Sequence, residues 1–168
     1  MSEEKNNQKK SIFLFYGEDS FSSNEKLKLW KAEFIKKHGE DCLETIQGKT
    51  LKPQEFGTNI EALPFLSEKR LIIVRDFLAT KKTDNQKQVA ENLEKAADTS
   101  IIVFHENKAV DKRTSLYKKI AKIGNLNEFK SLNPNNISKW VLDRSKKEGI
   151  NISFPNANYL AQNCGPDL

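Results

Sequence analysis

Short apolar runs alternate along the chain with stretches whose apolar residues recur at helical spacing. Each strong run is apolar at successive positions, which is typical of a strand buried on both faces. The strand candidates are residues 11–16, 42–46, 71–74, 100–105 and 126–129, of which the second and the last are weaker. Such strands, when they alternate with helices, indicate a parallel sheet covered by helices on both sides. We therefore predict an α/β domain over residues 11–131.

Helix signals occur in most of the intervening stretches. After the first strand, an amphipathic stretch opens near Ser22 or Ser23 and ends at Gly39. Pro53 has the position that proline prefers at a helix start, and Asp111 is expected to cap a later helix. These helices carry apolar faces of the kind that pack on a sheet.

The alternation of strands and helices stops near Ser131. Pro134 and Pro155 each open a further helical stretch, and no strand of comparable strength follows them. We predict a disordered polar lead at residues 1–10, then the α/β domain, then the start of a small all-α, lid-like domain at residues 132–168. Two helices are too few to bury a core of their own, so we expect the chain to be a fragment of a longer protein.

The turn after the first strand lacks the residues of a phosphate-binding loop. Counted from Gly17, a P-loop would have Gly, Lys and Ser or Thr at positions 22–24, whereas this chain has Ser, Ser and Asn there. Glu18 and Asp19 add two negative charges, and like charges about 4 Å apart repel by roughly 1 kcal/mol in water. We therefore predict a P-loop NTPase-like domain without a functional P-loop, with no catalytic site and no cofactor.

Metal and redox chemistry has little support in the composition. The two cysteines, Cys42 and Cys164, lack the spacing of metal or redox sites, so we expect free thiols. The two histidines, His38 and His105, are isolated from each other, and no metal site is predicted. No apolar run is long enough to span a membrane, and the first ten residues are too polar for a secretory signal. We expect a cytoplasmic protein without a membrane partner.

Basic residues gather in one part of the chain. Residues 107–147 hold 11 lysines and arginines against 3 acidic residues, whereas the whole chain has a net charge of +5. Such a block can meet DNA or an acidic partner, and it can also be a set of solvated helix faces, since no aromatic residues interleave with the lysines. One alternative function is thus a stand-alone nucleic-acid-binding module that uses residues 108–147. The candidates for DNA or subunit contact are Lys112, Arg113, Lys118, Lys119 and Lys122.

Four short motifs carry a family resemblance. They are residues 15–21 (FYGEDSF), 62–75 (ALPFLSEKRLIIVR), 100–117 (SIIVF, then DKR and LY) and 128–130 (EFK). In this order and spacing they resemble the delta subunit of the bacterial DNA polymerase III clamp loader. The resemblance covers residues 11–168 and implies an AAA+-like domain, a small helical domain that is cut short, and a C-terminal collar domain that is absent here.

The resemblance also implies a function. The delta subunit does not hydrolyse ATP; it binds the replicative sliding clamp, which is the beta subunit, and holds one ring interface open so that the clamp can be loaded on primed DNA during DNA replication. Its implied partners are the clamp, the delta prime and gamma or tau loader subunits, and primed DNA reached through the complex. The chain would then be a non-catalytic subunit of a nucleotidyltransferase, the DNA polymerase III holoenzyme.

An apolar tip between the second helix and the next strand enters the clamp in this family. By position, the tip falls on Pro64 and Phe65, flanked by Leu63 and Leu66. Four apolar residues in a row at a helix end are more than one helical face can bury, which favours a binding surface. Core packing of Phe65 and Leu66 at a helix-to-strand turn is the alternative.

Two polar residues lie where an active AAA+ ATPase would have functional groups. Asp76 has the place of a metal-binding acid, but Phe77 follows it instead of a second carboxylate, so we interpret Asp76 as a structural relic. Asn107 lies where a sensor residue would, and we expect it to cap a helix or form a turn.

Overall fold

The structure is a computed structural model that describes residues 11–64, 67–80, 83–131 and 134–164. The chain forms two compact units, Met1–Phe129 and Lys130–Leu168. No helix within the described ranges is long and apolar enough to cross a membrane.

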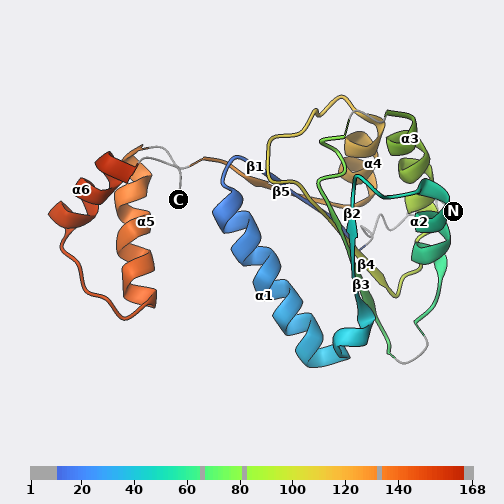
Figure 1. Ribbon diagram of the computed structural model, residues 1–168, viewed down its shortest axis with the longest axis horizontal. Coiled ribbons are helices and arrows are strands. Elements are labelled where there is room, and N and C mark those ends of the chain that lie inside the picture. The colour runs from blue at the N-terminus through green and yellow to red at the C-terminus, as the bar shows by residue number, and fades with distance from the viewer. Residues whose placement is uncertain (1–10, 65–66, 81–82, 132–133, 165–168) are drawn as a thin grey trace, which may run out of the picture. The chain divides into compact units, whose positions relative to one another are not determined.

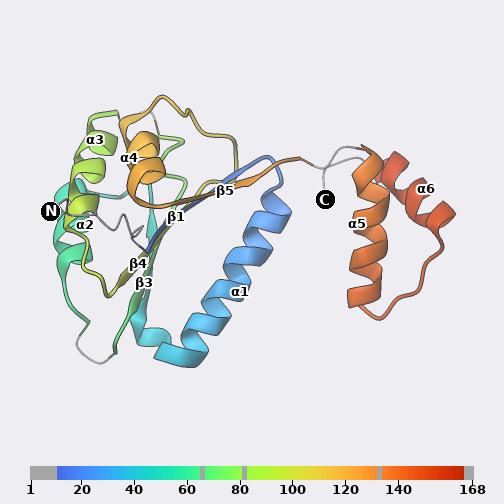
Figure 2. The same ribbon diagram turned by 180° about the vertical axis from the view of Figure 1, so that it is seen from behind.

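The first unit is a five-stranded parallel sheet between two layers of helices (Figures 1 and 2). Its elements are β1 (Ile12–Gly17), α1 (Ser20–His38), β2 (Leu43–Gln47), α2 (Pro53–Glu61), β3 (Arg70–Arg75), α3 (Thr83–Asn92), β4 (Ser100–His105), α4 (Ser115–Ile123) and β5 (Asn125–Phe129). The strands lie in the order β2-β3-β4-β1-β5, and all pairs are parallel. Helix α1 covers one face, and α2, α3 and α4 cover the other. The alternation of apolar runs predicts this architecture.

Both faces of the sheet are apolar, because successive strand residues point to opposite sides. In β3, Ile72 and Val74 pack with the helices of the three-helix layer, whereas Leu71 and Ile73 pack with α1. All four side chains are buried. The polar side chains of the central strands that can act on a partner or ligand therefore lie at the two ends of the sheet.

Neighbouring strands β1 and β4 send the chain to opposite faces, since α1 follows β1 and α4 follows β4. The carboxyl ends of strands at such a switch point are where open α/β sheets bind ligands. Gly17, the last residue of β1, lies here with a φ of +139°. A Cβ on Gly17 would lie 2.0 Å from the backbone oxygen of Phe129, so the close approach of β1 and β5 requires glycine.

Two helix starts differ from the sequence-based expectation. Helix α1 begins at Ser20, earlier than predicted, because the preceding aspartate caps it. In α4, Thr114 is the cap and accepts a hydrogen bond from the backbone N–H of Tyr117. The prediction that Asp111 caps this helix is wrong, since its carboxylate binds the guanidinium of Arg113 two residues further on.

The second unit contains α5 (Pro134–Lys147) and α6 (Phe154–Cys164), which pack as a helix pair. The hydroxyl of Ser138 lies 3.0 Å from the side-chain oxygen of Asn158 and joins the two helices. Three large apolar residues of α6 are exposed, namely Phe154, Tyr159 and Leu160.

We expect Gly17→Ala to destabilise the α/β unit strongly, because a methyl group there adds a clash to an unfavourable φ. Backbone strain of this kind costs about 1–3 kcal/mol, and overpacking costs about 1–3 kcal/mol more. Gly39→Ala is the matched control, since Gly39 has a φ of +88° but open space around its Cβ position. Urea unfolding of both variants measures the difference, and equal losses of stability would contradict the close approach of β1 and β5.

Candidate functional site

Four polar side chains meet at the carboxyl ends of β1, β3 and β4. The amide nitrogen of Asn24 in α1 donates to the side-chain oxygen of Asn107 at 3.1 Å, and its oxygen accepts from Arg75 at 3.2 Å. Asn107 in turn donates to the carboxylate of Asp76 at 3.1 Å. The structure thus brings together Asn24, Asp76 and Asn107, which the sequence analysis compared with the functional positions of an ATPase. The side chain of Asn107 bridges two elements and does not cap a helix.

Ser23 occupies the position where a P-loop has its lysine. Its hydroxyl is buried and lies 3.0 Å from Nε2 of His105, the last residue of β4. Burial, together with the nearby charge of Arg75, lowers the pKa of His105 to about 4. At neutral pH the pair is therefore uncharged, and it offers no cation to a phosphate.

The amino end of α1 carries its own negative charge. Oδ1 of Asp19 accepts a hydrogen bond of 2.9 Å from the backbone N–H of Ser22. In phosphate-binding loops this helix end, with its free N–H groups and positive dipole, holds the ligand. Here the Asp19 carboxylate takes that place, which supports the prediction that nucleotide does not bind.

A buried carboxylate fixes the segment that follows β3. Glu106 is 1% exposed, and it accepts backbone hydrogen bonds from Phe77, Leu78 and Ala79 at 2.7, 2.7 and 3.0 Å. Burial raises the pKa of Glu106 to about 7, although the three hydrogen bonds favour its ionised form. These bonds hold the chain directly after Asp76, which has an unusual φ of +52°.

Sequence reasoning missed both Glu106 and the bond between Ser23 and His105. The only local signal for Glu106 is an acidic residue that follows an apolar strand directly. Its donors lie in the chain after another strand, so no spacing in the sequence connects them. No cluster of three or more metal-ligating side chains occurs among the described residues.

The chain toward the predicted tip leaves the end of α2 near the amino ends of the strands, at the opposite end of the sheet from this polar network. Leu63 is 74% exposed and Pro64 is half-buried. Phe65 and Leu66, the other two residues of the predicted tip, lie outside the described residues. A large apolar side chain with this exposure contributes little to the core.

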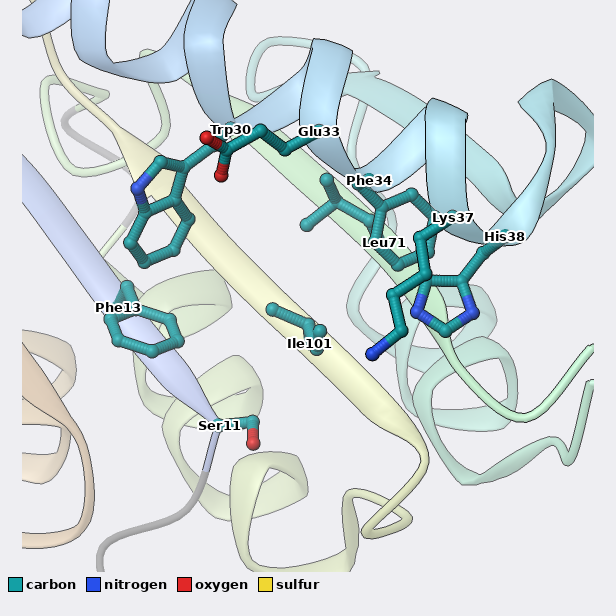
Figure 3. A pocket seen from close by; sticks show the side chains of 9 residues that line it. All are labelled: Ser11, Phe13, Trp30, Glu33, Phe34, Lys37, His38, Leu71 and Ile101. Atoms are coloured by element: carbon teal, nitrogen blue, oxygen red, sulfur yellow. The ribbon is translucent and has the colours of Figure 1, made fainter.

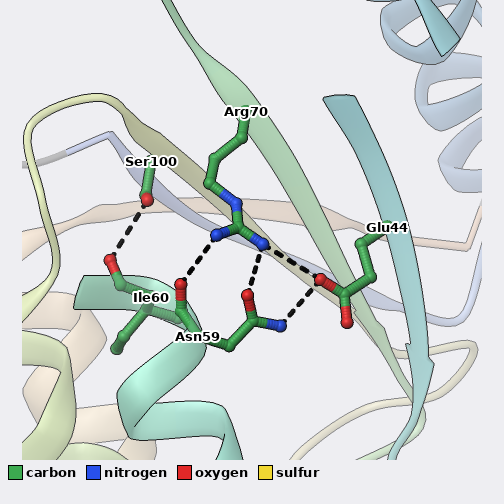
Figure 4. Close-up of polar contacts among 5 residues, drawn as sticks. All are labelled: Glu44, Asn59, Ile60, Arg70 and Ser100. Carbon is green, nitrogen blue, oxygen red and sulfur yellow. Dashed lines mark hydrogen bonds and ion pairs between the residues drawn. The ribbon is translucent and has the colours of Figure 1, made fainter. Parts of the chain in front are cut away.

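The base of this tip is held by a hydrogen-bonded cluster at the amino ends of β2, β3 and β4 (Figure 4). Arg70 donates to the backbone oxygen of Asn59 at 2.9 Å, to its side-chain oxygen, and to Glu44 at 3.1 Å. Asn59 also donates to Glu44 at 2.7 Å. The hydroxyl of Ser100 donates to the backbone oxygen of Ile60 at 3.1 Å. Side chains from two strands thus satisfy carbonyls at the end of α2, and the chain toward Leu63 starts from a fixed point.

The basic residues proposed for DNA or subunit contact divide into two groups. Lys112 forms an ion pair with Glu128, Lys119 with Glu94, and Arg113 with Asp111. Lys118 and Lys122 are exposed, and neither forms a direct ion pair with another described residue, although Lys118 is close enough to Asp111 to help lower the pKa of that carboxyl. The structure therefore leaves only two of these five cations without a neutralising carboxylate in contact.

An apolar cavity of about 320 Å³ lies between α1 and the amino ends of β1, β3 and β4 (Figure 3). Phe13 and Trp30 meet there edge to face, with ring centroids 4.8 Å apart. Phe34 and His38 line the other side with their rings 4.7 Å apart. This cavity is remote from the polar network at the carboxyl ends of the strands and takes no part in it.

Comparison with known proteins gives a family and a fold. Residues 13–130 match the family described as DNA polymerase III, delta subunit. The fold is similar to that of the Bacillus subtilis DNA clamp loader delta protein, with a TM-score of 0.66 and 21% sequence identity over 93% of this chain and 49% of that chain. It is also similar to the Thermotoga maritima RuvB Holliday junction branch migration motor, with a TM-score of 0.55 and 10% identity over 89% of this chain and 48% of that one.

The chain therefore spans about half the length of each of these two structures. No curated protein sequence matches it significantly. The two structural similarities confirm the predicted fold class, a parallel α/β domain of the AAA+-like kind followed by helices.

We expect the chain not to bind magnesium-ATP. The amino end of α1 is capped by a carboxylate, and the lysine position is a buried neutral serine. Calorimetric titration with magnesium-ATP should give no measurable heat of binding, while an intact P-loop ATPase titrated under the same conditions serves as the positive control. A dissociation constant in the micromolar range would contradict this prediction.

Proposed function

Because the chain belongs to the DNA polymerase III delta subunit family, we propose that it binds the replicative sliding clamp and holds one ring interface open. The clamp, the beta subunit, could then be loaded on primed DNA during DNA replication. The observation that carries this proposal is the exposed Leu63 on a firmly held base.

An exposed apolar side chain is a useful binding group only if its position is fixed before the partner arrives. The base of the tip meets this condition, since Arg70 and Ser100 bond the last carbonyls of α2. A preorganised contact loses less conformational entropy on binding than a loose one. The tip would then act as an apolar anchor in a pocket of the clamp, with Leu63, Pro64, Phe65 and Leu66 as its residues.

The polar network at the carboxyl ends of the strands supports the proposal that this subunit holds the clamp without hydrolysing ATP. Asn24, Arg75, Asp76 and Asn107 bond to one another, so these side chains stabilise the turn in the absence of a phosphate. In this proposal the delta prime and gamma or tau subunits complete the loader, and ATP hydrolysis occurs on subunits other than this one. The chain would work in the cytoplasm, without a membrane partner.

The domain organisation follows from the same proposal. Residues 11–131 would form the AAA+-like domain, and residues 132–168 would begin the lid-like helical domain. The exposed apolar residues of α6 support this division, because a pair of helices leaves apolar surface that further helices would cover.

A stand-alone DNA-binding role has weaker support. Three of the five candidate cations already contact carboxylates, which reduces their attraction for phosphate. Lys118 and Lys122 are separated by one helical turn and lie on the outer side of α4, away from the buried Leu116 and Ile120. We propose that these two lysines meet DNA or a neighbouring subunit within the assembled loader, and that they bind DNA only weakly in the isolated chain.

We expect Phe65→Ala to lower the affinity for the sliding clamp by about 30- to 1,000-fold, because truncating a hot-spot anchor costs about 2–4 kcal/mol. Leu63→Ala should lower it less, and both variants should keep their folding stability within about 1 kcal/mol of the parent. Surface plasmon resonance with immobilised clamp and thermal unfolding measure the two quantities.

Leu29→Ala is the control for this pair, since Leu29 is also exposed, at 63%, but lies on α1 away from the tip. It should change neither quantity. Normal clamp binding by a badly destabilised Phe65→Ala would instead mean that Phe65 is a core residue, for which truncation costs about 3–5 kcal/mol.

We expect weak DNA binding by the isolated chain, with a shallow salt dependence. A contact made by Lys118 and Lys122 alone neutralises about two phosphates, so the logarithm of the binding constant should fall with a slope of about −2 against the logarithm of salt concentration. Lys118→Glu combined with Lys122→Glu should abolish this binding, whereas Lys36→Glu on α1 should have little effect. Filter binding across a salt series decides the point, and a slope steeper than about −5 would favour the DNA-binding alternative.

A further inference from the structure

A groove of about 270 Å³ lies directly beside the tip. Its lining residues are Asp41, Cys42, Leu43, Glu44, Leu63, Pro64 and Arg70. One part of the lining is apolar and includes the exposed Leu63, and another part carries two carboxylates. The groove is therefore lined by both apolar side chains and carboxylates.

The positive charge in this groove is already engaged. The guanidinium of Arg70 donates to Asn59 and Glu44, within the cluster that holds the end of α2. Glu44 accepts one hydrogen bond from Arg70 and one from the side chain of Asn59, and both go to the same carboxylate oxygen, Oε2. Neither Oε1 of Glu44 nor the carboxylate of Asp41 has a hydrogen-bond partner among the described residues. Acceptors for a positively charged donor are thus available along the groove.

The residues that flank the tip in the chain are also negatively charged. Glu61 and Glu68 border the tip in the chain, and neither forms an ion pair with another described residue. Lys69, which follows Glu68 in the chain, donates to the backbone oxygen of Asp98. This acidity does not follow from composition, since the chain as a whole carries a net charge of +5. A partner that approaches the tip therefore meets a negative potential, which attracts cations.

We propose that the groove receives a lysine or arginine side chain of the sliding clamp, beside the apolar contact of the tip. The aliphatic stem of such a residue packs on Leu63 and Pro64, while its charged end reaches Asp41 and Glu44. This inference rests on the proposed function and adds a charge-selective contact to it. The apolar anchor supplies most of the affinity, and the cation in the groove fixes the orientation of the clamp and speeds association.

The test compares Asp41 with its neighbour Glu40, which lies in the same short turn and is exposed but does not line the groove. With the full chain and the sliding clamp, Asp41→Asn should weaken binding about two- to fivefold and Asp41→Lys about tenfold or more. Glu40→Gln and Glu40→Lys should each have a smaller effect than the matching Asp41 variant. The differences should shrink as salt rises to about 1 M, where the Debye length is about 3 Å.

A second arm identifies the partner residue by charge exchange. Basic residues of the clamp near its binding pocket are changed to Glu one at a time, and one of these variants should restore the binding of Asp41→Lys. Thermal unfolding of each Asp41 variant should match that of the parent, because Asp41 is exposed.

The outcomes separate this inference from the proposed function. If Leu63→Ala weakens clamp binding but the Asp41 and Glu40 variants behave alike, the groove contact is wrong and the tip contact stands. If the parent chain does not bind the clamp, or Leu63→Ala and Phe65→Ala bind it normally, both proposals are overturned.

Discussion

The sheet is apolar on both faces, and this constraint determines where the polar side chains of its central strands can act. Five parallel strands lie between α1 on one side and three helices on the other, and side chains such as Leu71 and Ile72 are buried on opposite faces. A charge placed on either face would lose its hydration without a partner. Among the described residues, the polar clusters of the sheet therefore lie where strands end, and the two ends of the sheet carry different arrangements.

At the carboxyl ends, hydrogen bonds between the protein's own side chains connect the turn after β1 to the neighbouring strands. Asp19 caps α1, and Asn24 and Asn107 connect α1 to the chain after β4. Glu106 accepts hydrogen bonds from three backbone N–H groups beyond β3 and so fixes this segment. These hydrogen bonds connect the ends of neighbouring strands at the point where the chain passes from one face of the sheet to the other.

At the amino ends, the same confinement produces a rigid platform. Arg70 opens β3 and Ser100 opens β4, and both donate to carbonyls at the end of α2. The chain that leaves this platform exposes Leu63, beside a groove that contains Asp41 and Glu44. An apolar contact and a charged contact are thereby available on one surface, a combination that gives a protein interface both affinity and orientation.

The sequence by itself determined the fold class, the strands and the approximate positions of the helices, because burial on both faces leaves a local pattern of successive apolar residues that needs no knowledge of the neighbours. It also determined that positions 22–24 lack the residues of a P-loop. Only the tertiary structure decided the strand order, the bond between Ser23 and His105, and the cluster of Glu44, Asn59 and Arg70. These contacts join residues far apart in the chain, and such pairs have no periodicity. Their geometry exists only after the strands have paired and the helices have packed.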